Sequence, residues 1–280
     1  MKYPNIRSVS PRVGMLALGA PFLFSLAQPA PQPSDDVDCC DEASSIESMA
    51  PPALLDGTVI QSSGAIEADL EAFRALLGNP INGTAPGQQP TGHREINWDA
   101  VPAAVTNVTN FPPAFFNTNS TRGLVYTPAS HDLEVSDRRF TDINPTYEAE
   151  FNPFSGQKLF SPIGHTKADV HFFVAGSDTE AAVKGFGAVF MDVDQEGSSG
   201  LVVFGEDGRP LAKLLAPVRS DARGASFVGV VFPEPVIGRV RIVSGNGRLA
   251  PGKDDVSQGG ERDLVVLDDF LYGEPTATGN

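Results

Sequence analysis

The chain has 280 residues, of which 35 are acidic and 20 are Lys or Arg, and its formal charge is −15. This balance excludes nucleic acid as a partner and disfavours anionic lipid surfaces, because both attract cationic protein surfaces. The simplest role of the acidity is to keep an exported protein soluble. The 28 Gly and 24 Pro residues separate short runs rich in Val and Phe, a composition typical of an all-β sandwich or barrel.

Residues 1–27 have the pattern of a signal peptide. Three basic residues precede an apolar stretch, residues 13–27, in which Ser25 and Ala27 occupy the small-residue positions before a cleavage site. The alternative is a transmembrane anchor, but the stretch is shorter than the ~18–20 apolar residues that a spanning helix needs. We therefore expect a secreted, periplasmic or cell-surface protein with no membrane insertion after signal cleavage.

Residues 28–53 are acidic and rich in proline, and this composition predicts a disordered linker. The linker holds both cysteines of the chain, Cys39 and Cys40. Because they are adjacent, they do not form the separated pairs of a disulfide framework. A vicinal disulfide, an intermolecular bridge, a weak metal site and the absence of any folded role all stay open for them.

Residues 54–94 predict a helix and a loop that pack on the sandwich. Ile66, Leu70, Phe73 and Leu77 recur at helical spacing, and the opposite face of the helix is charged. The loop that follows is rich in Gly, Pro, Asn and Gln, which are turn-forming or polar residues. We expect one amphipathic helix near the N-terminus of the folded part.

Residues 95–275 predict the sandwich domain, and residues 276–280 a polar tail. Val170, Phe172 and Val174 alternate along one predicted strand and share one of its faces. From residue 123 onward, about nine short strands without intervening helices indicate antiparallel pairing and a jelly-roll-like β-sandwich. The candidate strands are residues 94–99, 123–127, 133–135, 169–175, 185–192, 200–204, 211–215, 226–232, 238–243 and 264–271.

Four segments carry a resemblance to a known group of proteins. They are FRALLGNPINGTAPGQQPTGHREINWDAVP, GFGAVFMDVD, SFVGVVF and DLVVLDDFLYGEP. In them the chain resembles uncharacterised exported bacterial β-sandwich proteins, some of which resemble proteins with a C-terminal sorting signal of Pro-Glu-Pro type. That signal is absent here, since no hydrophobic anchor follows Pro275. The resemblance implies export and a β-sandwich but no activity, and the last segment is also similar to the last strand of many carbohydrate-binding jelly rolls.

The first candidate metal site is a turn with alternating acids. Asp192, Asp194 and Glu196 are followed by a glycine, and such a turn offers several of the oxygen ligands that calcium prefers. It resembles the first half of an EF-hand loop but has Val203 at the twelfth position. The expected context is also strand-turn-strand, so an EF-hand is rejected. The competing interpretation is an exposed acidic turn at the end of a strand.

The second candidate metal site joins the ends of the sandwich. Asp268 and Asp269 are neighbours on the last predicted strand, so their side chains should point to opposite faces. By similarity to carbohydrate-binding jelly rolls, in which calcium commonly joins the first and last strands, Glu95 would be the distant ligand. The competing interpretation is that Asp268 or Asp269 pairs with Arg239 or Arg241, or caps backbone amides, because a buried carboxylate needs a partner.

Four aromatic residues are candidates for stacking on a sugar. Trp98, Tyr126, Tyr147 and Tyr272 lie near predicted strand ends or in loops. Sugar binding on a sandwich commonly uses exposed aromatic rings. The competing interpretation is that each ring is buried and packs in the core.

Signals of catalysis are weak in this sequence. The histidines, His93, His131, His165 and His171, lack metal-ligand spacing such as H-E-x-x-H, and no G-x-S-x-G motif is present. We therefore expect an exported, non-catalytic module that binds a glycan or a cell-surface component and carries a structural calcium ion. The alternatives are a glycan-active hydrolase using an acidic pair and a structural protein of the envelope or matrix.

Overall fold

The computed structural model describes residues 56–128, 132–219 and 224–279. The predicted signal peptide, the predicted linker with its two cysteines, and His131 lie outside the described residues. Contacts divide the chain into residues 1–39 and 40–280, and every described residue belongs to the second unit. In the described part, no helix is long and apolar enough to cross a bilayer.

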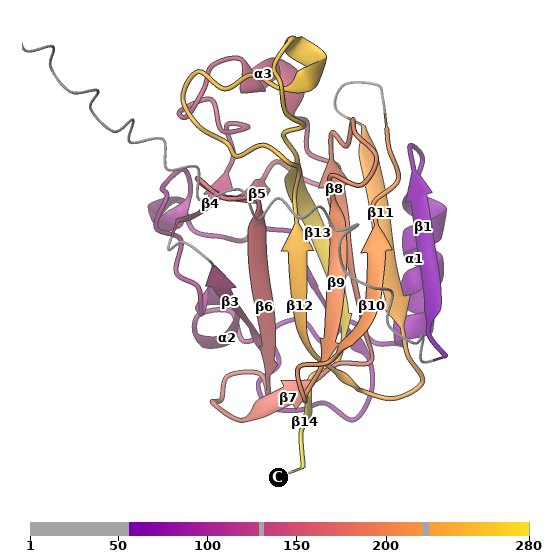
Figure 1. Cartoon of the computed structure of the whole chain (residues 1–280). Coiled ribbons are helices and arrows are strands. Elements are labelled where there is room, and N and C mark those ends of the chain that lie inside the picture. Colours follow the sequence, from indigo (N-terminus) through magenta and orange to yellow (C-terminus); the bar gives the residue numbers. More distant parts are fainter. Residues whose placement is uncertain (1–55, 129–131, 220–223, 280) are drawn as a thin grey trace, which may run out of the picture. The chain divides into compact units, whose positions relative to one another are not determined.

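The described residues form two antiparallel sheets in a sandwich-like arrangement (Figure 1). The first sheet has the order β1-β11-β8-β13-β5-β4, with β2 also paired to β13. The second sheet has the order β10-β9-β12-β6-β7-β14, with β3 also paired to β6. The first sheet comprises β1 (Thr58–Ser63), β2 (His93–Ile96), β4 (Leu133–Ser136), β5 (Leu159–Pro162), β8 (Gly185–Met191), β11 (Ala225–Val231) and β13 (Val266–Gly273). The second comprises β3 (Leu124–Pro128), β6 (Lys167–Phe173), β7 (Glu180–Ala182), β9 (Gly200–Gly205), β10 (Pro210–Leu215), β12 (Ile237–Val243) and β14 (Thr276–Ala277). The expectation of a mostly β, sandwich-like fold is confirmed, and the jelly-roll connectivity stays a prediction.

Alternating side chains fill the space between the two sheets. In β6, the buried residues Ala168, Val170 and Phe172 alternate with half-buried ones, as the sequence predicts. From the first sheet, Phe186 and Phe190 of β8 enter the same cluster of buried residues. One face of each sheet therefore contributes to a common inner core.

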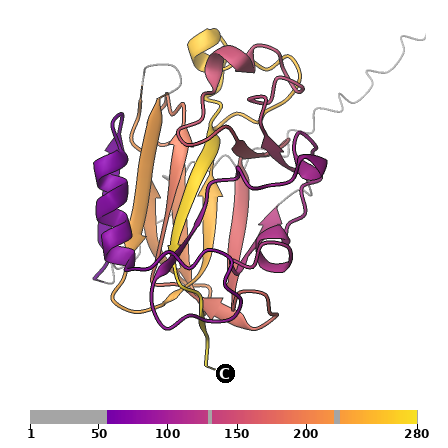
Figure 2. The ribbon, with the colours of Figure 1, turned by 180° about the vertical axis from the view of Figure 1, so that it is seen from behind.

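Helix α1 (Glu67–Leu77) covers the outer face of the first sheet (Figure 2). Its buried residues are Leu70, Phe73 and Leu77, three of the four apolar residues that predict the helix. The ring of Phe73 lies over Gly229, where a Cβ atom would stand only 2.6 Å from a ring carbon. The sheet therefore accepts the helix because glycine leaves room for this ring.

Four short strands were not predicted from the sequence, and the structure adds short helical turns. The missed strands are β1, β5, β7 and β14. Strand β1 lies at a sheet edge and is mostly exposed, so it lacks a strong apolar alternation. Strand β14 belongs to the predicted polar tail and pairs with β7. The additional helical turns are α2 (Phe115–Thr118), α3 (Tyr147–Glu150) and the 3₁₀ turns Ala103–Val105 and Val256–Gln258.

Candidate metal centre

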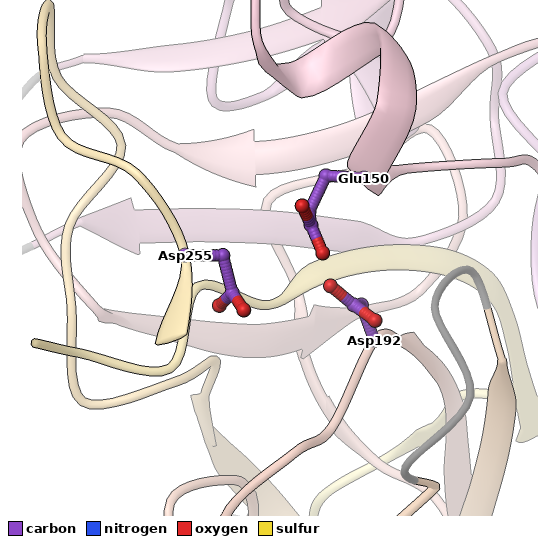
Figure 3. Close-up of side chains that lie close together, drawn as sticks. All are labelled: Glu150, Asp192 and Asp255. Carbon is purple, nitrogen blue, oxygen red and sulfur yellow. The ribbon is translucent and has the colours of Figure 1, made fainter. Parts of the chain in front are cut away.

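Three acidic side chains from three distant segments meet beside the end of β8. Glu150 ends α3, Asp192 follows β8, and Asp255 precedes the 3₁₀ turn Val256–Gln258. One carboxylate oxygen from each lies within 4.8 Å of the other two, and all three residues are buried. Figure 3 shows the three carboxyl groups directed toward a common point. We refer to these residues as the acidic triad.

Local backbone geometry directs each member of the acidic triad inward. Asp192 adopts a left-handed conformation, with φ of 69°, as the chain leaves β8. Asp255 accepts hydrogen bonds from the backbone N–H groups of Ser257 and Leu264, both at 2.6 Å. The hydroxyl group of Ser257 donates to Oε1 of Glu150 at 2.6 Å. Ser257 therefore links two members of the triad and orients both carboxyl groups.

The electrostatics of the acidic triad favour a bound cation. Burial and, after it, the neighbouring Glu150 raise the pKa of Asp192 to about 10. Oε2 of Glu150 is buried and, among the described residues, receives no N–H or hydroxyl donor, although a protonated Asp192 carboxyl group can hydrogen-bond to Glu150. In the same part of the chain, neither Glu150 nor Asp255 forms an ion pair with a basic side chain. The negative charge of a buried carboxylate must be neutralised or paired. Because no described basic side chain does this for Glu150 and Asp255, the acidic triad must retain protons or bind a metal ion.

A second layer of acids surrounds the acidic triad. Asp194 is half-buried, and burial followed by the charge of Asp255 raises its pKa to about 7. Asp263 accepts hydrogen bonds from the backbone N–H groups of Asp194 and Gln195, at 3.3 and 3.0 Å. Burial raises the pKa of Asp263 as well, against the lowering effect of these hydrogen bonds. The turn after β8 is therefore fastened to the segment that precedes β13.

The acidic triad could hold a metal ion. Two oxygens bound to one Ca²⁺ ion at about 2.3–2.6 Å lie at most about 4.6–5.2 Å apart. The observed spacing of 4.8 Å or less fits this limit. All three ligand groups are carboxylates, which suit hard cations such as Ca²⁺, Mg²⁺ and Mn²⁺ better than softer metals.

The structure treats the three predicted ligands of the first site differently. Asp192 is part of the acidic triad, and Asp194 lies beside it. Glu196 is exposed and outside the group. Glu150 and Asp255 were missed, because they lie far from the predicted turn in sequence and no local spacing connects them. Burial distinguishes these two residues from the exposed acids of the chain, but burial depends on the tertiary fold and is not visible in the sequence.

Asp268 and Asp269 do not point to opposite faces, although regular strand alternation predicts this for neighbours. The pairing of β13 with β8 shifts register between Leu267 and Phe270, which is a β-bulge at the two aspartates. The hydroxyl group of Ser155 consequently lies 3.2 Å from Oδ1 of Asp268 and 2.6 Å from Oδ1 of Asp269. Burial and, after it, Asp269 raise the pKa of Asp268 to about 8.

The predicted partners of this aspartate pair form their ion pairs with other residues, although burial and, after it, the charge of Glu95 raise the pKa of Asp269. Both carboxylate oxygens of Glu95 accept hydrogen bonds from Arg74, at 2.7 and 3.1 Å. Arg239 and Arg241 both pair with Asp169, at 2.8 and 2.7 Å. Within the described ranges, the single cluster of three metal-ligating side chains is the acidic triad. Oδ2 of Asp268 instead accepts hydrogen bonds from the backbone N–H groups of Phe154 and Ser155, at 2.6 and 3.3 Å, so this aspartate caps backbone amides. The calcium site at Asp268, Asp269 and Glu95 stays a prediction.

The four predicted sugar-stacking residues are buried. Trp98 and Tyr126 are 1% exposed, and Tyr147 and Tyr272 are fully buried. Trp98 stacks on Phe160 with ring centroids 4.3 Å apart, so this ring face is already covered. Their burial supports the competing interpretation, in which each ring packs in the core, and sugar stacking stays a prediction.

Comparisons with protein-family models, curated proteins and solved structures found no match to this chain. The resemblance to exported bacterial β-sandwich proteins stays an expectation. Function is therefore inferred from the geometry and chemistry of the molecule itself.

Proposed function

We propose that this protein is an exported, non-catalytic β-sandwich module that binds one calcium ion at its acidic triad. The observation that carries the proposal is the convergence of three buried carboxyl groups, with ligand oxygens within 4.8 Å of one another. A carboxylate cluster of this kind is unstable without protons or a cation. Calcium supplies two positive charges and accepts oxygen ligands in flexible geometry, which suits three groups from irregular segments.

The calcium ion would have a structural role, cross-linking three segments of the chain. It would join α3, the turn after β8 and the segment before β13, which local hydrogen bonds hold only in part. A ligand that binds only the folded state stabilises that state according to its concentration and its Kd. The site would therefore stiffen the loops at one end of the sandwich and leave the inner core unchanged.

We also propose that the sandwich is a jelly roll. Eight strands follow one another along the chain, interrupted only by the short β7: β5, β6, β8, β9, β10, β11, β12 and β13. In the first sheet four of them have the order β11-β8-β13-β5, and in the second the others have the order β10-β9-β12-β6. This order supports a long antiparallel hairpin folded over on itself, which yields two packed Greek keys.

The binding role, toward a glycan or a cell-surface component, is part of the same proposal. Export and the acidic surface are compatible with it. The hydrolase alternative receives no support from the pair Asp268 and Asp269, since Asp268 is fully buried and Asp269 is 6% exposed. Both carboxyl groups are also engaged by Ser155, which leaves a substrate no direct access.

The decisive experiment is thermal unfolding of the protein in EDTA and in millimolar calcium. At a free calcium concentration about 100-fold above Kd, the expected stabilisation is about 2.7 kcal/mol, or roughly 5–10 °C in Tm. Glu150→Gln should abolish most of this shift. In EDTA the variant should unfold at or above the wild-type temperature, because it removes a buried charge and keeps the acceptor for Ser257.

The matched control is Glu196→Gln, on the same turn as Asp192 but exposed. It should keep the full calcium shift. Absence of any shift in the wild type would refute calcium binding. A shift that persists in Glu150→Gln and disappears in Glu196→Gln would place the ion on the exposed turn instead of in the triad.

A further inference from the structure

A second feature with the character of a binding site is a pocket beside β2 and α2. Its volume is about 340 Å³, near the lower end of the range of about 300–1,000 Å³ that is typical of small-molecule sites. Residues 96–98 and 100–102 contribute to its lining, together with Phe115, Phe116 and Arg122. The pocket shares no residue with the acidic triad.

The pocket combines an apolar floor with a polar rim. Trp98 and Phe116 contribute buried aromatic surface and contact each other edge to face, with centroids 5.4 Å apart. Asn97, Asn119 and Ser120 add polar groups, and the two asparagines are exposed. An apolar surface with a few convergent polar groups is the usual construction of a site for a small organic ligand.

Arg122 is the one charged residue that lines this pocket. Its Nε donates to the backbone oxygen of Glu95 at 2.9 Å, and its Nη1 donates to the hydroxyl group of Ser120. No carboxylate lies within ion-pair distance of its guanidinium group in the described part of the chain. By contrast, Arg94 pairs with Glu274 at 2.7 Å. Arg122 is therefore a half-buried positive charge without a counter-charge, although the chain has a large excess of acids.

Two further observations favour a ligand at this charge. Burial lowers the pKa of Arg122, which means that the environment penalises its unbalanced charge. Its guanidinium carbon also lies 5.9 Å from the centre of the Phe116 ring, so the cation is next to the aromatic floor. An anion placed here would compensate the charge and contact the apolar surface at the same time.

We infer that this pocket binds one small carboxylate with a hydroxylated ring, the chemistry of a hexuronic acid residue. The two Nη groups of an arginine form paired hydrogen bonds with a carboxylate, and the asparagines can bond hydroxyl groups. The exposed lining residues Ala100 and Pro102 offer apolar carbons to the C–H face of the ring. The inference rests on the binding role proposed above and names its ligand class. A single carboxylate is favoured over a phosphate or a polyanion, because the formal charge of −15 repels multiply charged ligands more strongly.

The test is calorimetric titration of the full chain with D-galacturonate, D-galactose and D-galactose 6-phosphate. Galacturonate should bind at least about tenfold more tightly than galactose, because only it has a carboxylate for the arginine. Arg122→Lys keeps the charge but loses the paired donors, and should reduce galacturonate binding. Arg122→Gln should remove the preference for galacturonate over galactose. The control Arg209→Gln, at a side chain that is 85% exposed, should change neither affinity.

Melting of each variant with and without calcium separates the two proposals. Arg122→Gln should retain the calcium-dependent shift of Tm, which shows that the variant is folded. The pocket inference is overturned if folded Arg122→Gln binds galacturonate like the wild type, or if the phosphate ester binds more tightly. It also fails if a neutral glycan alone binds, or if no sugar binds while calcium still stabilises the protein. Binding of a neutral glycan alone would leave a binding role elsewhere on the protein. Stabilisation by calcium without any sugar binding would leave only the calcium site.

Discussion

The protonation of the buried His93 side chain depends on its two hydrogen-bond acceptors, one of which is the carboxylate of Glu95. Its Nδ1 lies 2.5 Å from the backbone oxygen of Gly78, and its Nε2 lies 2.9 Å from Oε1 of Glu95. Both neighbours are acceptors, so both ring nitrogens must carry protons for both hydrogen bonds to form. Burial lowers the pKa of His93, but the hydrogen bonds to Glu95 and Gly78 outweigh this effect and raise it above 6.5.

The raised pKa of His93 predicts a loss of stability as pH increases. A group with a higher pKa in the folded state stabilises that state fully below its unfolded pKa, about 6.5 here. This contribution disappears as pH rises through the folded-state pKa. We expect the urea midpoint of the wild type to fall between pH 6 and pH 9 by more than that of His93→Gln. An NMR titration should place the pKa of His93 above 6.5, and a value below 6.5 would contradict the prediction.

At the scale of elements, one aromatic ring fixes the position of α1 on the first sheet. Phe73 fits over paired glycines, since Gly229 of β11 lies opposite Gly187 of β8. Residues of β8 and β11 with larger side chains surround this position and form the outer core with the helix. The shape of the contact therefore depends on the absence of Cβ atoms from two neighbouring strands.

Gly229→Ala should destabilise the protein by about 1–3 kcal/mol, because the added methyl group collides with the Phe73 ring. In a Phe73→Ala background the same substitution should cost clearly less, since the ring is gone. Urea unfolding of the four proteins in this double-mutant cycle measures the coupling. Equal costs in both backgrounds would show that the collision is with the sheet backbone. Gly279→Ala, at a site with open space, is the neutral control.

At the scale of the whole molecule, the proposed calcium ion connects segments that the sheets leave apart. Asn144 adds one such link, because its side chain donates to the backbone oxygen of Lys253 at 3.0 Å. Tyr147 adds another, since its hydroxyl group and the backbone of Ala250 lie 3.2 Å apart. These contacts join the region of α3 to the region before β13, and the same two regions supply Glu150 and Asp255 to the acidic triad.

Calcium should therefore slow hydrogen exchange locally. We expect protection of amides in residues 144–152, 192–198 and 254–264 on addition of calcium, while the strands of the inner core stay unchanged. The reason is that an ion bound at the triad suppresses local opening of the segments that supply its ligands. Hydrogen exchange followed by mass spectrometry measures this directly. Equal protection over the whole chain would indicate a general effect of the salt. No protection would contradict the proposed structural role of the calcium ion.

Local patterns in the sequence were sufficient for several elements. Helical spacing of Leu70, Phe73 and Leu77 predicts α1, and alternation of Val170 and Phe172 predicts the buried face of β6. Such patterns are reliable because one face of each element must be apolar wherever the rest of the chain lies. The acidic turn at Asp192 was also visible, since its acids are close together in sequence.

Only the tertiary structure decided which acids meet and which aromatic rings stay accessible. Glu150 and Asp255 join Asp192 through contacts between distant segments, and a β-bulge places Asp268 and Asp269 together. Sequence spacing carries no information about either arrangement, because both depend on how the sheets and loops pack. The sequence by itself determined the acidity, the strand-rich composition and the amphipathic helix. Burial and convergence of charge were decided by packing, since desolvation depends on every neighbour in space.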